Sequence, residues 1–203
     1  MHLSLEFRLF NCREEIVLAS GSPRRRAYFE DLGITFRVVP ANIPEQRQPE
    51  EKSRAYIERL AREKAEHVAV NNPEHWIVAA DTVVCIDDTV LEKPVDETAA
   101  VEMLQRLSGR KHSVRTAVCL WNGMLGVCDV SIVSTTVVFW DVTKSMILAY
   151  VRSGEPMDKA GSYGIQGKGA FLVREIHGSY SNVVGLPLYE FYEMLNRYGL
   201  LEN

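Results

Sequence analysis

Residues 20–25 (SGSPRR) have the composition of an anion-binding turn, and they directly follow the apolar residues 16–19. Ser22 is suited to a helix N-cap, and Pro23 is suited to the first helical turn. The N–H groups of a helix start, the positive end of its dipole and guanidinium groups all favour a phosphate at this point. An ordinary strand–helix junction with surface arginines fits this local pattern equally well.

Asp81 is a candidate for metal binding or proton transfer because it directly follows the apolar residues 77–80. A carboxylate at the end of a buried strand is costly unless it is paired, protonated or bound to a metal. The alternative is an aspartate that caps a turn by accepting hydrogen bonds from backbone N–H groups. When Asp81 is considered without the other motifs, this alternative is favoured.

Two lysines lie where they could face an anionic ligand. Lys64 follows Leu60 by one helical turn and precedes Val68 by another, so it belongs to the apolar stripe of a predicted helix. This position favours a functional role or a side chain that snorkels to solvent. Lys93 precedes Pro94 in an extended segment that can project it into a cleft, although a lone lysine is more commonly solvated.

Residues 158–169 (DKAGSYGIQGKG) contain four glycines, which indicates a loop whose backbone approaches another group closely. The amide of Gln166 offers both a donor and an acceptor, which suits the edge of a base. A flexible surface loop is the alternative, but Tyr163 and Ile165 are apolar enough to hold the loop in place.

The chain alternates between β-type and amphipathic helical stretches, which predicts an α/β fold. Residues 15–203 are expected to form one domain with two lobes around a cleft, because neither a linker nor a repeat is apparent. Residues 1–14 are expected to be a poorly ordered extension. The predicted strands are residues 16–19, 35–39, 76–80 with a continuation at 82–86, 113–121, 127–140 and 171–176, and the predicted helices are residues 23–32, 50–70, 96–107, 143–151 and 188–198.

The formal net charge of −4 argues against bulk attraction to nucleic acid, so an anionic ligand requires local clusters of Arg and Lys. The four cysteines form no C-x-x-C pair, no secretory leader is apparent, and no apolar run is long enough to span a membrane. These features predict a cytoplasmic protein with free thiols that contacts neither nucleic acid nor a membrane.

Together, these motifs resemble those of the Maf-type nucleoside triphosphate pyrophosphatases, in the family's order and over residues 16–200. Arg25, Thr82 and Gln166, with the loop at residues 45–48, resemble the branch that acts on dTTP and UTP. The branch that acts on 7-methyl-GTP has an additional tryptophan after the Ser-Pro pair, which this chain lacks. The matching segments are residues 20–25, 61–65 (AREKA), 80–82 (ADT), 92–94 (EKP), 107–109 (LSG), 158–161 (DKAG), 165–167 (IQG) and 183–187 (VVGLP).

The resemblance implies an elongated α/β fold with a mixed, bent sheet flanked by helices around a central cleft, similar to the inosine triphosphate pyrophosphatases. It implies hydrolysis of dTTP and UTP to the nucleoside monophosphate and pyrophosphate, with modified pyrimidine nucleotides as further candidate substrates. It also implies a divalent cation (Mg²⁺ or Mn²⁺), a homodimer, and a house-cleaning role with a link to cell division arrest through septum inhibition.

The implied site combines phosphate binding, metal binding and base selection. Glu45 and Asp81 are the expected metal ligands, and Asp81 is also the candidate general base, alone or together with the metal. The resemblance assigns Asp81, Lys64, Lys93 and Glu45 to catalysis, Ser20, Ser22, Arg24, Lys64 and Lys93 to the phosphates, and Arg25, Thr82 and Gln166 to substrate specificity.

Two other functions remain open at this point. The first is a purine-directed pyrophosphatase with the same chemistry and a different pocket. The second is a nucleotide-binding regulator of cell division without essential catalysis. The complete set of Asp81, Lys64, Lys93 and Glu45 argues against the second.

Overall fold

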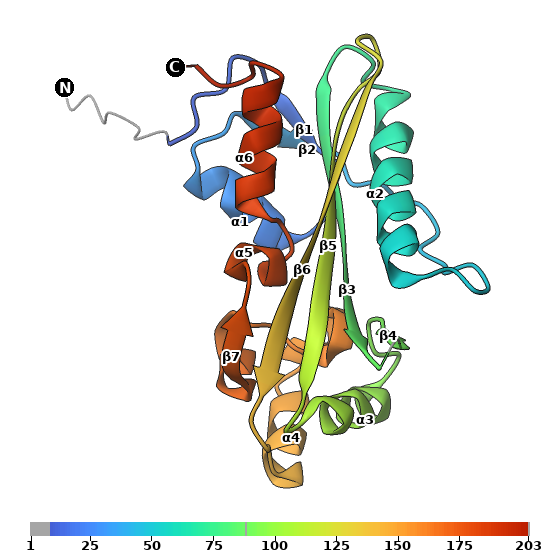
Figure 1. Cartoon of the computed structure of the whole chain (residues 1–203), viewed down its shortest axis with the longest axis vertical. Helices are drawn as coiled ribbons and strands as arrows, with labels where there is room; N and C mark the ends of the chain where they lie inside the picture. Colours follow the sequence, from blue (N-terminus) through green and yellow to red (C-terminus); the bar gives the residue numbers. More distant parts are fainter. Residues whose placement is uncertain (1–8, 88, 203) are drawn as a thin grey trace, which may run out of the picture.

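One mixed sheet runs along the molecule in the computed structural model, which describes residues 9–87 and 89–202 (Figure 1). Its strands are β1 (Ile16–Leu18), β2 (Phe36–Val38), β3 (Trp76–Ile86), β4 (Thr89–Leu91), β5 (Lys111–Asn122), β6 (Val127–Phe139) and β7 (Val173–His177). Their order is β2-β1-β3-β5-β6-β7, and β4 pairs with β3 beside this path. β1 pairs in parallel with β2 and β3, and the other pairs are antiparallel.

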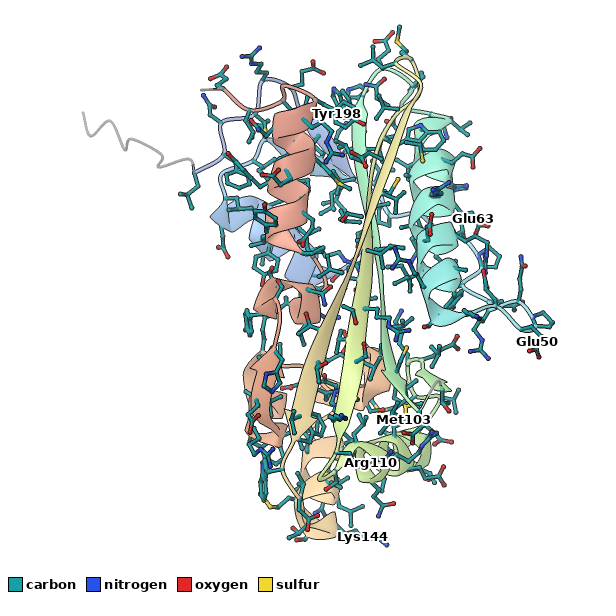
Figure 2. The ribbon with its side chains drawn as sticks, viewed as in Figure 1. Glu50, Glu63, Met103, Arg110, Lys144 and Tyr198 are labelled. Carbon is teal, nitrogen blue, oxygen red and sulfur yellow. The ribbon has the colours of Figure 1, made fainter. Side chains whose placement is uncertain are left out.

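Helices cover this sheet, which confirms the predicted α/β class. They are α1 (Pro23–Asp31), α2 (Ser53–Ala69), α3 (Glu97–Leu107), α4 (Lys144–Val151), α5 (Tyr180–Val184) and α6 (Leu188–Arg197), with 3-10 turns at Glu155–Asp158, Ala160–Ser162 and Gly167–Leu172. At one end of the sheet α2 lies on one side, and α1 and α6 lie on the other, whereas α3 and α4 lie at the opposite end (Figure 1). Tyr198 and Lys144 mark these two ends in Figure 2. Among the described helices, none has the length and apolar character needed to cross a membrane.

β3 is buried on both faces, which explains its continuous apolar run. Ile77 and Ala79 pack into the core beneath α2, whereas Val78 and Ala80 pack into the core formed with α1 and α6. Successive side chains of a strand point to opposite faces. Asp81, the next residue in this alternation, therefore faces α2.

Asp81 lies inside β3, which confirms the predicted continuation at 82–86 but corrects the placement of Asp81 at the end of a strand. The strand continues because β5 pairs with it on both sides of this position, with Asp81 opposite Ala117. The Asp87-Asp88 pair that follows β3 is typical of a hairpin turn, and Asp88 lies outside the described residues.

A separate core at the far end fixes the start of the glycine-rich segment. Leu104 of α3, Phe139 of β6 and Ile147 of α4 are buried there together with Tyr163. The Tyr163 hydroxyl lies 2.7 Å from Nε2 of His112. The segment was predicted as a loop, but its close packing folds parts of it into 3-10 turns.

The described part of the N-terminal segment packs against the rest of the chain. The N–H of Phe10 donates to the Leu32 carbonyl (2.9 Å), and the N–H of Arg13 donates to the Leu200 carbonyl (3.0 Å). Residues 1–8, the larger part of the extension predicted to be poorly ordered, lie outside the described residues.

We expect Gly161→Ala to lower the free energy of unfolding by about 2 kcal/mol, because it carries two costs. Gly161 has a φ of +67°, and an added Cβ would lie 2.9 Å from the Val84 side chain. Gly126→Ala is the matched control, since Gly126 has a φ of +65° and no described atom within 4 Å of such a Cβ. Denaturant unfolding measures both variants. Equal losses would mean that the contact with Val84 contributes nothing.

Candidate active site

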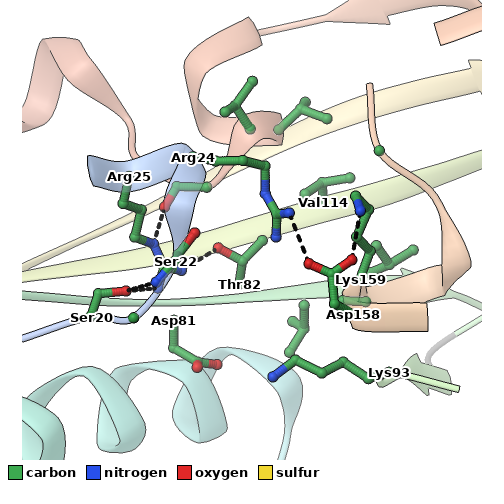
Figure 3. A pocket seen from close by; sticks show the side chains of 18 of the residues that line it. Ser20, Ser22, Arg24, Arg25, Asp81, Thr82, Lys93, Val114, Asp158 and Lys159 are labelled. Carbon is green, nitrogen blue, oxygen red and sulfur yellow. Dashed lines mark hydrogen bonds and ion pairs between the residues drawn. The ribbon is translucent and has the colours of Figure 1, made fainter. Parts of the chain in front are cut away.

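A cleft of about 500 Å³ lies along β3, between the start of α1 and the glycine-rich segment. Side chains from these elements surround it (Figure 3). The structure brings together at this cleft every residue that the sequence analysis assigned to a site, namely Ser20, Ser22, Arg24, Arg25, Glu45, Lys64, Asp81, Thr82, Lys93 and Gln166.

Lys64 is the centre of a cluster of charged groups at the α2 side of the cleft. Its Nζ lies 2.6 Å from Oδ1 of Asp81 and 2.7 Å from Oε1 of Glu45. The side chains of Lys64 and Asp81 are only 8% and 11% exposed. Lys93 is 62% exposed and approaches from the other side, with its Nζ 3.8 Å from Oε2 of Glu45. Two carboxylates and two ammonium groups therefore meet in one place.

The two carboxyl groups of this cluster have different acidities. Burial raises the pKa of Asp81 above its ordinary value, and the charges of Lys64 and Arg25 offset this only in part. Burial also pushes the pKa of Glu45 upward, but the hydrogen bond and charge of Lys64, with the charges of Lys93 and Arg25, outweigh it and leave this pKa below its ordinary value. Asp81 is therefore the better proton acceptor of the two, and Glu45 stays ionised to lower pH.

Arg25 is engaged by the protein on three sides. Its Nε donates to the Gly185 carbonyl (2.7 Å), its Nη1 to Oγ of Ser20 (3.1 Å) and its Nη2 to Oγ1 of Thr82 (3.0 Å). These bonds tie the start of α1 to β3 and to the end of α5 (Figure 3). Arg25 therefore shapes the wall of the cleft.

Arg24 faces the cleft from the start of α1, and some of its N–H donors have no acceptor among the described residues. Nη1 of Arg24 lies 3.4 Å from Oδ2 of Asp158, whose other oxygen lies 2.6 Å from Nζ of Lys159 (Figure 3). Ser22 occupies the predicted N-cap position before Pro23, but its side chain makes no capping hydrogen bond. An anion can take the place of that missing cap.

Thr116 is buried behind this wall, where it supports Thr82, and was missed by the sequence analysis. The Thr82 hydroxyl, which accepts from Arg25, lies 2.9 Å from the Thr116 hydroxyl, and Thr116 donates to the Asn182 carbonyl at 2.9 Å. No local signal marks Thr116, because only the register of β3 with β5 places it opposite Thr82.

Tyr56 and Glu92 are further cleft residues without a predicted role. The Tyr56 hydroxyl lies 3.2 Å from Oε1 of Glu92 and 3.1 Å from the Glu45 carbonyl oxygen. Glu92 and Asp158 lie in two of the motifs that carry the family resemblance, whereas Tyr56 lies in no such motif. Its bond to the backbone of Glu45 helps to hold that carboxylate beside Lys64.

Gln166 lies at the glycine-rich side of the cleft. Its side chain is exposed, and within the described residues it has no hydrogen-bond partner. Both amide atoms of Gln166 are therefore available to a ligand.

The residues that build this cleft fall within positions 19–185. A family model described as Maf-like protein matches residues 15–198 of this chain. The chain belongs to the Maf family. The match to the Maf family includes the whole cleft and leaves out residues 1–14 and 199–203.

Relatives within the Maf family are similar over nearly their whole length. The dTTP/UTP pyrophosphatase of Desulfotalea psychrophila is 47% identical over 193 residues, which cover 95% of this chain and 99% of that protein. The dTTP/UTP pyrophosphatase of Shigella sonnei is 49% identical over 187 residues, which cover 92% and 94%. Among solved structures, the Ham1 protein of Staphylococcus aureus matches 62% of this chain and 72% of that chain, with a TM-score of 0.42 and 15% identity.

Proposed function

We propose that this chain hydrolyses dTTP and UTP to the nucleoside monophosphate and pyrophosphate. The names of the Maf relatives support this substrate choice. The observation that carries the proposal is the buried Lys64, which bridges Asp81 and Glu45 in the same cleft as an uncapped helix start. Such a cleft suits a polyphosphate that must be held and attacked by water.

Three cations can converge on the phosphates from three different elements. Arg24 lies at the start of α1, Lys64 lies in α2, and Lys93 follows β4. A triphosphate brings about four negative charges, which increase at the leaving group as the bond breaks. Cations held in fixed positions stabilise that charge without reorganisation, which is the main source of catalysis in such reactions.

The donor set of the cluster fits a divalent cation. Glu45 and Asp81 present hard oxygen ligands that already approach one common atom, Nζ of Lys64. No group of three or more His, Cys, Asp or Glu in the described part of the chain could hold a metal by itself. Mg²⁺ is commonly held by one or two carboxylates together with substrate phosphates and water, so this pair fits Mg²⁺ or Mn²⁺. When bound, such a cation would neutralise phosphate charge and lower the pKa of a coordinated water.

Asp81 is the proton acceptor in this proposal. Its raised pKa makes it a stronger base than an ordinary aspartate, and its bond to Lys64 fixes its direction. A water placed between Asp81 and the α-phosphorus would lose its proton to the carboxylate as it attacks. General-base assistance of this kind contributes about 10²–10⁴-fold to the rate.

Gln166 reads the base in this proposal. Uracil and thymine present an acceptor at O4 and a donor at N3, and a single amide can pair with both. Cytosine reverses this pattern, and a site with a fixed amide leaves polar groups unpaired when cytosine enters. The side chain of Gln166 is exposed in the cleft and has no hydrogen-bond partner among the described residues, which supports this role.

We expect Gln166→Glu to lower kcat/KM for UTP relative to CTP by about tenfold, which is ~1.4 kcal/mol and lies within the ~1–3 kcal/mol expected for one such pair. The variant keeps the size of the side chain but replaces its donor with a second acceptor, which leaves O4 unpaired while the amino group of cytosine still finds an acceptor. The ratio of the two kcat/KM values at fixed Mg²⁺ measures the effect. An equal loss for both substrates would exclude Gln166 from base reading.

The proposed function is tested by the products formed from dTTP, UTP, ITP and 7-methyl-GTP with Mg²⁺. We expect the highest kcat/KM for dTTP and UTP, with one pyrophosphate released per monophosphate. Faster turnover of ITP or 7-methyl-GTP would favour the purine-directed alternative. Nucleotide binding without turnover would favour a regulator, and release of orthophosphate would contradict cleavage between the α- and β-phosphates.

The remaining expectations rest on the resemblance and extend the same proposal. We propose that residues 15–203 act as one domain, that the protein forms a homodimer, and that modified pyrimidine nucleotides are also cleaved in a house-cleaning role linked to septum inhibition. Sedimentation equilibrium tests the dimer, and assays with modified dUTP analogues test the wider substrate range.

A further inference from the structure

The loop at residues 164–169, which carries Gln166, is closed by two side chains that lie outside it. Tyr150 comes from α4, and Glu155 comes from the 3-10 turn Glu155–Asp158. The bonds that close the loop run from Gly164 N–H to the Tyr150 hydroxyl (3.2 Å), from the Tyr150 hydroxyl to Glu155 Oε1 (3.0 Å), from Lys168 N–H to Glu155 Oε2 (3.0 Å) and from Gly169 N–H to Glu155 Oε1 (2.9 Å). We call this pair the Tyr150–Glu155 clasp.

The glycines of the loop allow its two ends to meet at the clasp. A Cβ on Gly169 would collide with the Gly164 carbonyl oxygen and the Tyr150 hydroxyl. Gly167 has a φ of +71°, and a Cβ there would lie 3.0 Å from Oε2 of Glu155. Because these contacts leave no room for side chains, the loop backbone rests directly on the clasp.

Gln166 depends on this backbone for its position. Its own side chain has no hydrogen-bond partner among the described residues, so nothing on the side chain itself fixes its direction. The preceding Ile165 is buried, which anchors the loop on one side. On the other side, Lys168 and Gly169 are held by Glu155.

We propose that Glu155 and Tyr150 are positioning residues that set the selectivity for uracil and thymine over cytosine by fixing the loop that carries Gln166. This inference rests on the proposed function, because it assumes that Gln166 reads the base. Neither residue is assigned to the reaction itself. Substituting them is therefore expected to change the ratio of kcat/KM between UTP and CTP more than the rate of the reaction step that all substrates share.

The clasp requires a carboxylate at position 155. Burial acts to raise the pKa of Glu155, but the bonds from Gly169, Lys168 and Tyr150, with the charge of Lys159, outweigh it and lower this pKa. An ionised carboxylate only accepts hydrogen bonds, which matches its three donors. An amide would turn its NH₂ group towards at least one of these donors and lose that bond.

The test compares Glu155→Gln and the milder Tyr150→Phe with the wild type. Glu175→Gln is the matched control, because it makes the same exchange at an exposed site on β7. We expect the UTP-to-CTP ratio of kcat/KM to fall about tenfold in Glu155→Gln and about threefold in Tyr150→Phe. Glu175→Gln should leave this ratio unchanged.

A double-mutant cycle separates positioning from general destabilisation. In a Gln166→Ala background, adding Glu155→Gln should leave the UTP-to-CTP ratio unchanged, since the clasp acts through Gln166. Hydrogen exchange gives a second readout that does not depend on activity. We expect the amides of residues 168 and 169 to exchange about tenfold faster in Glu155→Gln than in the wild type.

The outcomes distinguish this inference from the proposed function. Unchanged exchange of these two amides would overturn the clasp, and an unchanged ratio with faster exchange would overturn its role in selectivity. If the effects of Glu155→Gln and Gln166→Ala on the UTP-to-CTP ratio were fully additive, that role would also be overturned. If the wild type releases no pyrophosphate from UTP, the proposed function fails. The clasp is then judged by exchange and by the relative affinities for α,β-methylene UTP and CTP, which cannot be cleaved at that bond.

Discussion

Replacing Asp81 with asparagine is expected to lower kcat for dTTP and UTP about 100-fold or more while the fold persists. The substitution preserves side-chain size at a buried position of β3, 2.6 Å from Nζ of Lys64. It removes the proposed proton acceptor, one of two proposed metal ligands and a negative charge. Pyrophosphate release at saturating Mg²⁺ measures the effect, and circular dichroism verifies the fold.

The control for Asp81→Asn is the same exchange in a surface ion pair. Asp87 is 64% exposed and pairs with Arg110, so Asp87→Asn should retain near-normal turnover. A folded Asp81→Asn protein with near-normal turnover would remove Asp81 from the mechanism.

Lys64→Met is expected to lower kcat/KM about 100-fold or more for every triphosphate alike, because the phosphates carry no base identity. Methionine keeps the apolar stem of Lys64 in its buried position but removes the charge that holds Asp81 and Glu45 together. The loss of this cation should also raise the pKa of Asp81 further. Since the ionised carboxylate is the proton acceptor, the acidic limb of the pH–rate profile should move to higher pH.

Assays with UTP, dTTP and CTP across a range of pH measure both effects of Lys64→Met. Lys144→Met, at the exposed start of α4, is the matched control and should behave as the wild type. A changed UTP-to-CTP ratio with an intact rate for UTP would contradict the assignment of Lys64 to the phosphates.

Much of the cleft could be predicted because its central groups interrupt regular patterns. Lys64 stands out as a charge on the apolar stripe of a helix, and the predicted helix at residues 50–70 corresponds to α2 at Ser53–Ala69. Asp81 stands out as a charge in an apolar run, although it was placed at a strand end and lies inside β3 in the structure. A buried charge is costly without a partner, and in the structure each of these two residues is the partner of the other.

The rest of the site depends on contacts that no local pattern encodes. The Arg24–Asp158 pair joins residues 134 positions apart, and Thr116 meets Thr82 only through strand register. No helical or strand periodicity in the sequence marks Glu155, because its role comes from accepting hydrogen bonds from the backbone N–H groups of a loop that folds back on it. Long-range pairing of this kind is decided by the whole sheet rather than by the residues on either side.

The bond from Arg25 to the Gly185 carbonyl joins residues that are 160 positions apart. A chain made from its N-terminus contains α1, α2 and β3, and with them the Lys64 cluster, long before residue 185 leaves the ribosome. Until then Arg25 lacks one of its three anchors. Every charged residue that lines the cleft lies before position 185. The charged groups are therefore complete before the bond that braces their wall can form.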